Sequence, residues 1–239
     1  YHGVVACALG LACWKTYVGC PVEAQTRRMA ISVLGSALAL ADHLEDAVSV
    51  KEAELSKMRR LGVSEHNILI TQSNLASTYG TLGRLVEASR IQRDVYSGHV
   101  KLNGEEYIET LGAGSNYATS LIFLDRFEEA RSLLRKTVPV ARRVLGEDHE
   151  LTLMMRKIYA GALCKDNRAT FNDLREAVRT YEDTERIARR VLGGSHPLTV
   201  DIGRNLQIAQ ELLRRAREAG GVDALGDAVA AMMPPPGSA

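Results

Sequence analysis

The sequence predicts an all-α fold in which pairs of helices repeat along the chain. The first observation is an acidic residue followed by alanine, which recurs at Asp46-Ala47, Glu87-Ala88, Glu129-Ala130 and Glu176-Ala177. The alanines are separated by 41, 42 and 47 residues. Self-similarity at a period of this size is typical of arrays that stack one supersecondary unit per repeat.

Two further markers keep the same period. A small residue lies twelve positions before the marker alanine in three copies, at Gly35, Ala76 and Ala118. In the fourth copy Ala160 lies 17 positions before Ala177, which indicates a five-residue insertion within 164–173. A glycine follows each marker alanine by 15 or 16 positions, at Gly62, Gly104, Gly146 and Gly193. We expect small residues where two helices approach closely, and glycine where a helix ends in a left-handed residue.

Between the markers, apolar residues recur at the three- and four-residue spacing of an amphipathic helix, as in 71–79 and 127–136. Pro197 suits the first turn of a helix. We therefore predict helix pairs at about 25–61, 67–102, 108–145 and 151–192, and a closing helix at about 198–218. We assign 21–218 to the repeat array, 1–20 to part of a preceding repeat, and 219–239 to a largely disordered tail.

The composition excludes several classes of protein. The chain has 239 residues, of which 46% are hydrophobic, and its 30 basic and 29 acidic side chains give a net charge of +1. This balance argues against binding nucleic acid or an anionic membrane through the whole surface. The most apolar stretch, 4–14, is too short to span a bilayer and lacks the basic leader of a signal peptide. Because the chain begins at Tyr1 rather than Met, we expect it to belong to a longer protein.

The cysteines predict neither disulfides nor a metal site. They lie at Cys7, Cys13, Cys20 and Cys164, and their spacing matches no paired-cysteine metal motif. A chain with a large core needs no disulfide to fold. We expect free thiols, a cytoplasmic (intracellular) location, and no metal or cofactor.

Four segments carry a resemblance to a known family. They are 145–153 (LGEDHELTL), 192–200 (LGGSHPLTV), 73–79 (SNLASTY) and 83–88 (GRLVEA). Together they resemble the long tetratricopeptide repeat of kinesin light chains, and the resemblance extends over 21–218. It implies a right-handed αα-superhelix, a tetratricopeptide-like solenoid of about four helix pairs. The sequence departs from the family pattern at two places. The turn at Asn103-Gly104 lacks the Leu-Gly…His pattern, and Lys157-Ile158 departs from it in the first helix of the fourth pair.

The resemblance also implies a concave groove lined by the first helix of each pair. Asn74, Asn116 and Asn205 occupy the groove-facing position, where an amide can bind the backbone of an extended peptide. Ser73 and Ser115 precede the first two, and Lys157 and Arg204 take the place of those serines further along. We expect these seven residues to bind a protein or peptide partner of acidic character. A solvated polar surface with no ligand is the alternative interpretation.

Other patterns are better explained by structure than by chemistry. His66, His149 and His196 recur at the turn into each first helix, where we expect them to hydrogen-bond the free carbonyls of the preceding helix. The segment 112–118 (GAGSNYA) is similar to a dinucleotide-binding fingerprint, but no strand precedes it. The arginines near helix ends complement the helix dipole. No phosphate loop, zinc motif or nucleophile motif is present, so we predict that the chain is not an enzyme.

Three functions remain open at this point. The first is an interaction scaffold that binds a peptide or helical segment in its groove. The second is the sensor or regulatory region of a larger signalling ATPase or kinase, since similar arrays form the sensor ends of such proteins. The third is self-association through the ends of the solenoid, for which the N-terminal apolar segment and the insertion at 164–173 are the candidate surfaces.

Overall fold

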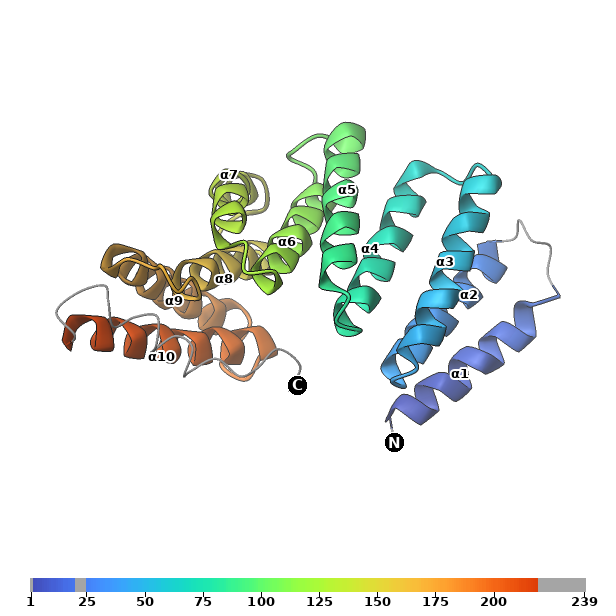
Figure 1. Ribbon diagram of the computed structural model, residues 1–239, viewed down its shortest axis with the longest axis horizontal. Coiled ribbons are helices and arrows are strands. Elements are labelled where there is room, and N and C mark those ends of the chain that lie inside the picture. The colour runs from blue at the N-terminus through green and yellow to red at the C-terminus, as the bar shows by residue number, and fades with distance from the viewer. Residues whose placement is uncertain (1, 20–24, 219–239) are drawn as a thin grey trace. The chain divides into compact units, whose positions relative to one another are not determined.

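The computed structural model describes residues 2–19 and 25–218 of the chain (Figure 1). These residues form ten α-helices and no strand, so the predicted all-α fold class is confirmed. The helices are α1 (His2–Tyr17), α2 (Gln25–Leu40), α3 (Leu44–Arg60), α4 (Glu65–Thr81), α5 (Leu85–Asn103), α6 (Ile108–Phe123), α7 (Phe127–Leu145), α8 (Glu150–Cys164), α9 (Phe171–Val191) and α10 (Pro197–Glu218).

The helices follow the predicted pairing. The pairs α2–α3, α4–α5, α6–α7 and α8–α9 begin and end within two residues of the expected ranges, and α10 is the closing helix. The segment assigned to a preceding repeat contains α1, which packs against α2. The predicted disordered tail, 219–239, lies outside the described residues.

The chain divides into two compact units, residues 1–102 and 103–239. In the first unit α1 packs on α2, α2 on α3, and α3 on α4. In the second unit each consecutive pair of helices from α6 to α10 is in contact. The second unit also brings α6 against α8 and α8 against α10, so the first helices of its pairs adjoin one another.

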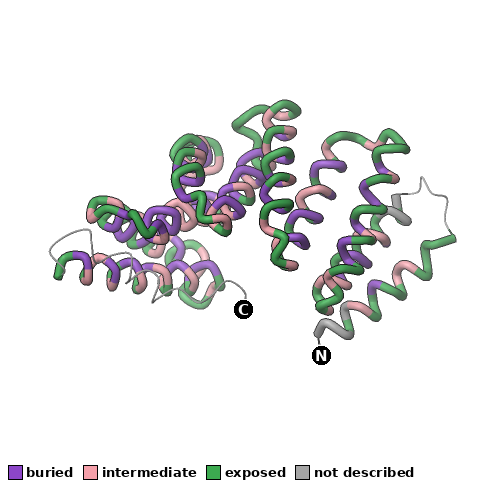
Figure 2. Tube along the Cα trace, in the orientation of Figure 1, coloured by how far each residue is buried: buried purple, intermediate pink, exposed green. Residues whose placement is uncertain are grey.

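Burial follows the repeat markers (Figure 2). The four marker alanines and the small residues of the first helices are all buried, and the group comprises Ala47, Ala88, Ala130, Ala177, Gly35, Ala76, Ala118 and Ala160. A Cβ on Gly35 would lie 3.0 Å from Cγ of Lys51. The absence of a side chain at this position therefore leaves room for a long residue of the next helix.

Lys51 is an uncommon buried cation that joins α3 to α4. Its side chain is only 6% exposed, and its Nζ donates to Oγ1 of Thr78 at 2.7 Å and to the carbonyl oxygen of Asn74 at 3.3 Å. Burial lowers the pKa of Lys51, while the nearby Glu54 acts in the opposite direction. The lysine thus fixes the spacing of these two helices in the first unit.

The turns use left-handed residues at two equivalent positions. The marker glycines Gly62, Gly104, Gly146 and Gly193 have φ values of +62°, +83°, +94° and +89°, as predicted for residues that end a helix. Five positions before the marker alanine, the turn inside each of the first three pairs is also left-handed, at Asp42, Gly83 and Asp125. Aspartate tolerates this conformation better than most residues, which explains its use where glycine is absent.

The recurring histidines have a structural role that differs from the predicted one. His149 and His196 accept hydrogen bonds at Nδ1 from the backbone N–H groups of Leu151 and Leu198, at 3.1 and 3.3 Å. They therefore satisfy free donors at the start of the following helix, not free carbonyls of the preceding one. His66 lies inside α4 and forms an edge-to-face contact with His99 at 6.1 Å. The expectation of carbonyl hydrogen bonds was wrong.

Replacing His149 with alanine should lower the free energy of unfolding by about 1 kcal/mol, because α8 loses its N-terminal cap. Asparagine is a good capping residue, so His149→Asn should retain most of the stability. Urea denaturation followed by circular dichroism measures both variants. An equal loss in the two would show that the imidazole acts through packing and not as a cap.

Candidate functional site

In the first unit, the predicted groove residues Ser73 and Asn74 lie on α4. The Asn74 side chain is exposed, whereas its carbonyl oxygen accepts hydrogen bonds from Lys51 and Thr78. Ser73 is partly buried and contacts α5, since Nε2 of Gln92 donates to its carbonyl oxygen at 3.3 Å. The Asn74 side chain is therefore exposed to solvent while its backbone is held in place. This arrangement suits a residue that contacts a binding partner.

In the second unit, Ser115 and Asn116 lie on α6 but face different surroundings. Asn116 is exposed, as predicted. Ser115 is only 1% exposed, and its Oγ has no hydrogen-bond partner among the described residues. It falls on the buried stripe of Leu111 and Ala118, at the four- and three-residue spacing of one helix face. The prediction that Ser115 contacts a ligand was therefore wrong.

The structure brings together Lys157, Asn205 and a residue that sequence reasoning missed, Asp201. Nζ of Lys157 on α8 contacts Oδ2 of Asp201 on α10 at 2.6 Å. Nδ2 of Asn205 donates to the carbonyl oxygen of Asp201 at 2.7 Å and to its Oδ1 at 3.2 Å. Asp201 neutralises the lysine, so the cationic end expected for the groove is reduced. Arg204 is exposed and forms no ion pair with a described residue.

We use the term helix-A face for the surface of α6, α8 and α10 that carries Asn116, Lys157, Asp201, Arg204 and Asn205. The Lys157–Asp201 pair bridges two neighbouring helices, with the lysine side chain 25% and the aspartate side chain 39% exposed. Asn116 and Arg204 contribute exposed polar groups. The face therefore presents hydrogen-bonding groups with a net charge of +1 from its three charged residues.

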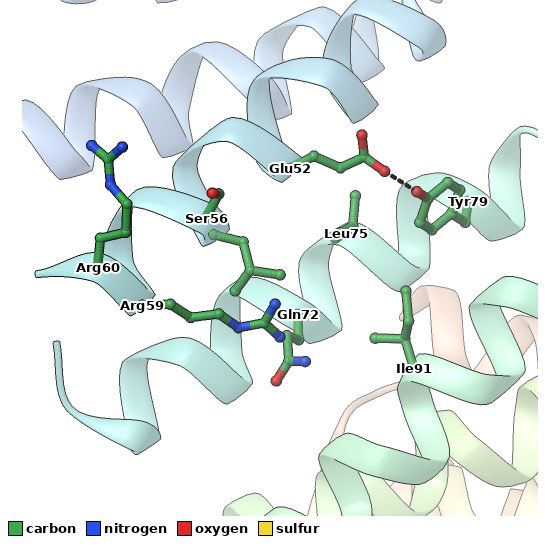
Figure 3. Close-up of a pocket in the computed structure, with 9 residues that line it drawn as sticks. Glu52, Ser56, Arg59, Arg60, Gln72, Leu75, Tyr79 and Ile91 are labelled. Atoms are coloured by element: carbon green, nitrogen blue, oxygen red, sulfur yellow. Dashed lines mark hydrogen bonds between the residues drawn. The ribbon is translucent and has the colours of Figure 1, made fainter. Parts of the chain in front are cut away.

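A cavity that the sequence did not predict lies in the first unit, between α3, α4 and α5 (Figure 3). Its volume is about 540 Å³, within the usual size of small-ligand sites. Leu55, Leu75 and Ile91 form its apolar floor, and the polar residues around them come from α3 and α4. Three separate helices build this cavity, so no local motif in the sequence reveals it. We refer to it as the α3–α5 pocket.

The two ends of the α3–α5 pocket differ in charge. At one end the hydroxyl of Tyr79 donates to Oε1 of Glu52 (Figure 3). Burial raises the pKa of Tyr79 to about 12, and this hydrogen bond adds to the effect, so the phenol stays neutral. Toward the other end Arg59 extends beside Gln72, and Arg60 lies farther out (Figure 3). The pocket thus has an anionic end, an apolar floor and a cationic end.

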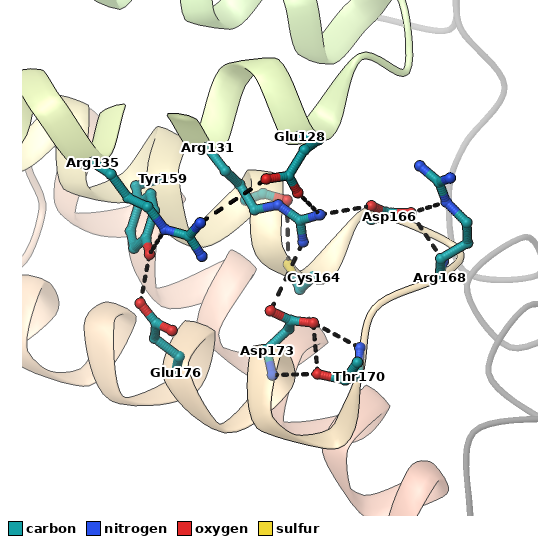
Figure 4. A network of polar contacts seen from close by, with 11 residues as sticks. Glu128, Arg131, Arg135, Tyr159, Cys164, Asp166, Arg168, Thr170, Asp173 and Glu176 are labelled. Carbon is teal, nitrogen blue, oxygen red and sulfur yellow. Dashed lines mark hydrogen bonds and ion pairs between the residues drawn. The ribbon is translucent and has the colours of Figure 1, made fainter. Parts of the chain in front are cut away.

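The insertion lies in a loop that is anchored to the core (Figure 4). The loop 165–170 between α8 and α9 has six residues, whereas the corresponding loops 41–43, 82–84 and 124–126 have three. Asp166 is 2% exposed and its Oδ2 contacts Nη2 of Arg131 on α7 at 3.1 Å. Thr170 and Asp173 form a capping box that begins α9.

Ala169 of the loop and Cys164 belong to the same buried cluster. This thiol is 4% exposed, and burial raises its pKa to about 11, so it stays protonated and unreactive. Among the described residues, no group of histidine, cysteine, aspartate and glutamate side chains has the geometry to bind a metal ion. No described helix is both long enough and apolar enough to cross a membrane.

Comparison with known proteins identifies the class of protein. The sequence profile of the tetratricopeptide repeat matches residues 68–106 and 110–150, which contain most of the second and third helix pairs. Residues 68–106 and 110–150 are therefore two tetratricopeptide repeats. No curated protein sequence matches the chain significantly.

Solved structures share the fold of this chain. A kinesin light chain from Podosopora anserina with nearly identical TPR-like repeats is 22% identical, covers 87% of this chain and 96% of its own, and has a TM-score of 0.67. A variant of it covers 79% and 87%, at 21% identity and a TM-score of 0.67. BtubC (BKLC) from P. vanneervenii covers 97% and 91%, at 18% identity and a TM-score of 0.70. These similarities show that the chain shares the tetratricopeptide-like solenoid fold of these structures.

Tetratricopeptide repeats are general scaffolds for protein–protein interaction, and folds of this type are typically non-catalytic. The predicted tetratricopeptide repeats are therefore confirmed by the profile matches, and the predicted solenoid fold by the solved structures.

Proposed function

We propose that the chain is a non-catalytic scaffold that binds an extended peptide segment of a partner protein on the helix-A face. The observation that carries this proposal is the direct contact of α6 with α8 and of α8 with α10. Lys157 on α8 and Arg204 on α10 occupy equivalent positions of the repeat, and together with Asn116 on α6 they form a row of polar side chains across the three helices.

The charges of the helix-A face indicate how a peptide would bind. Asp201 already accepts hydrogen bonds from Lys157 and Asn205, so this part of the face is a preformed polar floor. Arg204 is the exposed cation beside it, and a carboxylate of the partner would form a charge-assisted hydrogen bond there. Asn116 offers both a donor and an acceptor to the peptide backbone. A partner with one or two acidic residues fits better than a strongly acidic one.

The proposal places the chain in the cytoplasm. Cys7, Cys13 and Cys164 are free thiols, and disulfides are rare in reducing compartments.

The double variant Asn116→Ala, Arg204→Ala should weaken a partner that binds the helix-A face by about tenfold or more, since it removes one neutral and one charged hydrogen bond. The control is Gln207→Ala, which changes an exposed residue of α10 that lies outside the row. Quantitative mass spectrometry of proteins captured by the wild type and both variants identifies candidates, and calorimetry with a purified segment gives the dissociation constant.

The decisive result is a segment that the wild type and Gln207→Ala bind equally and the double variant binds weakly. If every captured partner binds the double variant as tightly as the wild type, the helix-A face is not the peptide-binding site. The variant Asn74→Ala is measured in the same way, and it tests the exposed Asn74 side chain of the first unit separately from the helix-A face. Because the Asn74 backbone, not its side chain, holds Lys51, this variant tests contact without disturbing the helix packing.

A further inference from the structure

The α3–α5 pocket is a second site, independent of the helix-A face, and its charges define what it can bind. Arg59 and Arg60 are exposed and form no ion pair with a described residue. The sequence accounts for this, because neither has an acidic residue three or four positions away on α3, unlike Arg84 and Arg126. Arg59 and Arg60 also complement the dipole of α3 at its C-terminal end. The dipole alone does not explain why a cavity lies beside them.

The anionic end limits the possible ligands. Glu52 is exposed to the pocket and keeps its carboxylate there, hydrogen-bonded by Tyr79 (Figure 3). A polyphosphate or a nucleic-acid backbone that entered the pocket would be repelled by this carboxylate, because both carry negative charge. A ligand that fits must carry an acidic group at one end only and a hydrogen-bond donor or cation at the other.

The dimensions of α3 set the spacing between those two groups. Glu52 and Arg59 are seven residues apart on the helix, which is about 10 Å along its axis. In an extended peptide, side chains at i, i+2 and i+4 share one face, and the outer two are about 13 Å apart. The central side chain of the peptide then lies over the apolar floor of Leu55, Leu75 and Ile91. The long side chain of Arg59 spans the difference between the two spacings.

We propose that the α3–α5 pocket docks an extended segment of a partner protein with alternating basic, aliphatic and acidic side chains. The aliphatic side chain packs on the floor, the acidic one pairs with Arg59, and the basic one pairs with Glu52. The polarity of the pocket also fixes the direction in which the two charged ends of the segment lie.

The probe for this proposal is the capped peptide acetyl-Lys-Ala-Leu-Ala-Glu-amide. It is titrated into the 239-residue chain labelled with ¹⁵N and with ¹³C at the methyl groups, and amide and methyl resonances are followed by NMR. We expect shifts concentrated at Leu55, Leu75 and Ile91. The Arg59→Gln variant should bind the peptide about fivefold more weakly, the upper end for an exposed ion pair. Arg90→Gln, an exposed charge on α5 outside the pocket lining, should bind it like the wild type.

Two matched peptides complete a thermodynamic cycle. Acetyl-Lys-Ala-Leu-Ala-Gln-amide lacks the carboxylate, and Arg59→Gln should bind it as well as the wild type does. Acetyl-Lys-Ala-Ala-Ala-Glu-amide lacks the aliphatic side chain and should not shift the three floor residues. The proposal is overturned if the first peptide leaves the floor resonances unchanged, or if Arg59→Gln weakens both glutamate and glutamine peptides equally. Shifts of the same residues on concentrating the protein alone would assign the pocket to a second copy of the chain, and would also overturn it.

Discussion

Replacing Asp166 with alanine is expected to lower the free energy of unfolding by about 3 kcal/mol, the largest effect predicted for a single substitution in this chain. The aspartate is 2% exposed and the Arg131 side chain 10% exposed, so the substitution leaves a buried guanidinium without its nearest buried counter-charge. The expected loss lies at the lower end of the range for broken buried ion pairs, because Glu128 and Asp173 still contact Arg131.

The loop itself is also weakened by this substitution. Oδ1 of Asp166 accepts a hydrogen bond from the backbone N–H of Arg168 at 2.9 Å, and alanine cannot replace it. Asp166→Asn keeps an acceptor oxygen and the side-chain volume while removing the charge, so it separates the two contributions and should fall between wild type and alanine.

The control for both variants is Arg168→Ala. Its side chain is 79% exposed and contacts Asp166 from the solvent side, so its loss should change stability by about 0.5 kcal/mol or less. Urea denaturation of the full chain, followed by circular dichroism, measures the three variants. If Asp166→Ala proves no more destabilising than Arg168→Ala, the buried ion pair does not anchor the loop.

The second large effect concerns the alanines that mark the repeat. Ala130→Leu should destabilise the chain by about 1–3 kcal/mol, because the extra methyl groups have no space in a packed interior. Ala130 is 0% exposed and belongs to a buried cluster with Leu121 of α6 and Ala162 of α8. A larger side chain must push α7 away from one of these helices.

The matched control inserts the same residue one position earlier. The Glu129 side chain is 54% exposed and pairs with Arg126, so Glu129→Leu removes only an exposed ion pair and should cost about 1 kcal/mol or less. Urea midpoints of the two leucine variants give the comparison directly. Equal destabilisation would mean that close approach of the helices does not explain why alanine recurs at this position.

The sequence predicted the helices well because their ends are determined locally. The marker glycines adopt the left-handed conformation that ends a helix, and the marker alanines are buried where the helices of a pair meet. Both properties depend on single residues at fixed positions of the repeat. Counting along the sequence was therefore enough to predict the bounds of each pair.

The binding residues were harder to predict because their surroundings come from distant parts of the chain. Lys157 pairs with Asp201, which is 44 positions away and has no marker of its own. Ser115 and Asn116 are adjacent in sequence, yet a rotation of one residue buries the first and exposes the second. The α3–α5 pocket requires side chains from three helices, and the position of those helices is a property of the packed unit.

The anchored loop at 165–170 has a consequence for how such an array can change during evolution. Asp166 ties the loop to α7, so the additional residues leave both Ala160 and Ala177 in the core. Residues can be added at this turn while the marker positions on both sides stay in the core, because the added sequence supplies its own buried anchor. The longer connection therefore changes the turn and the start of α9, and not the burial of the two marker positions.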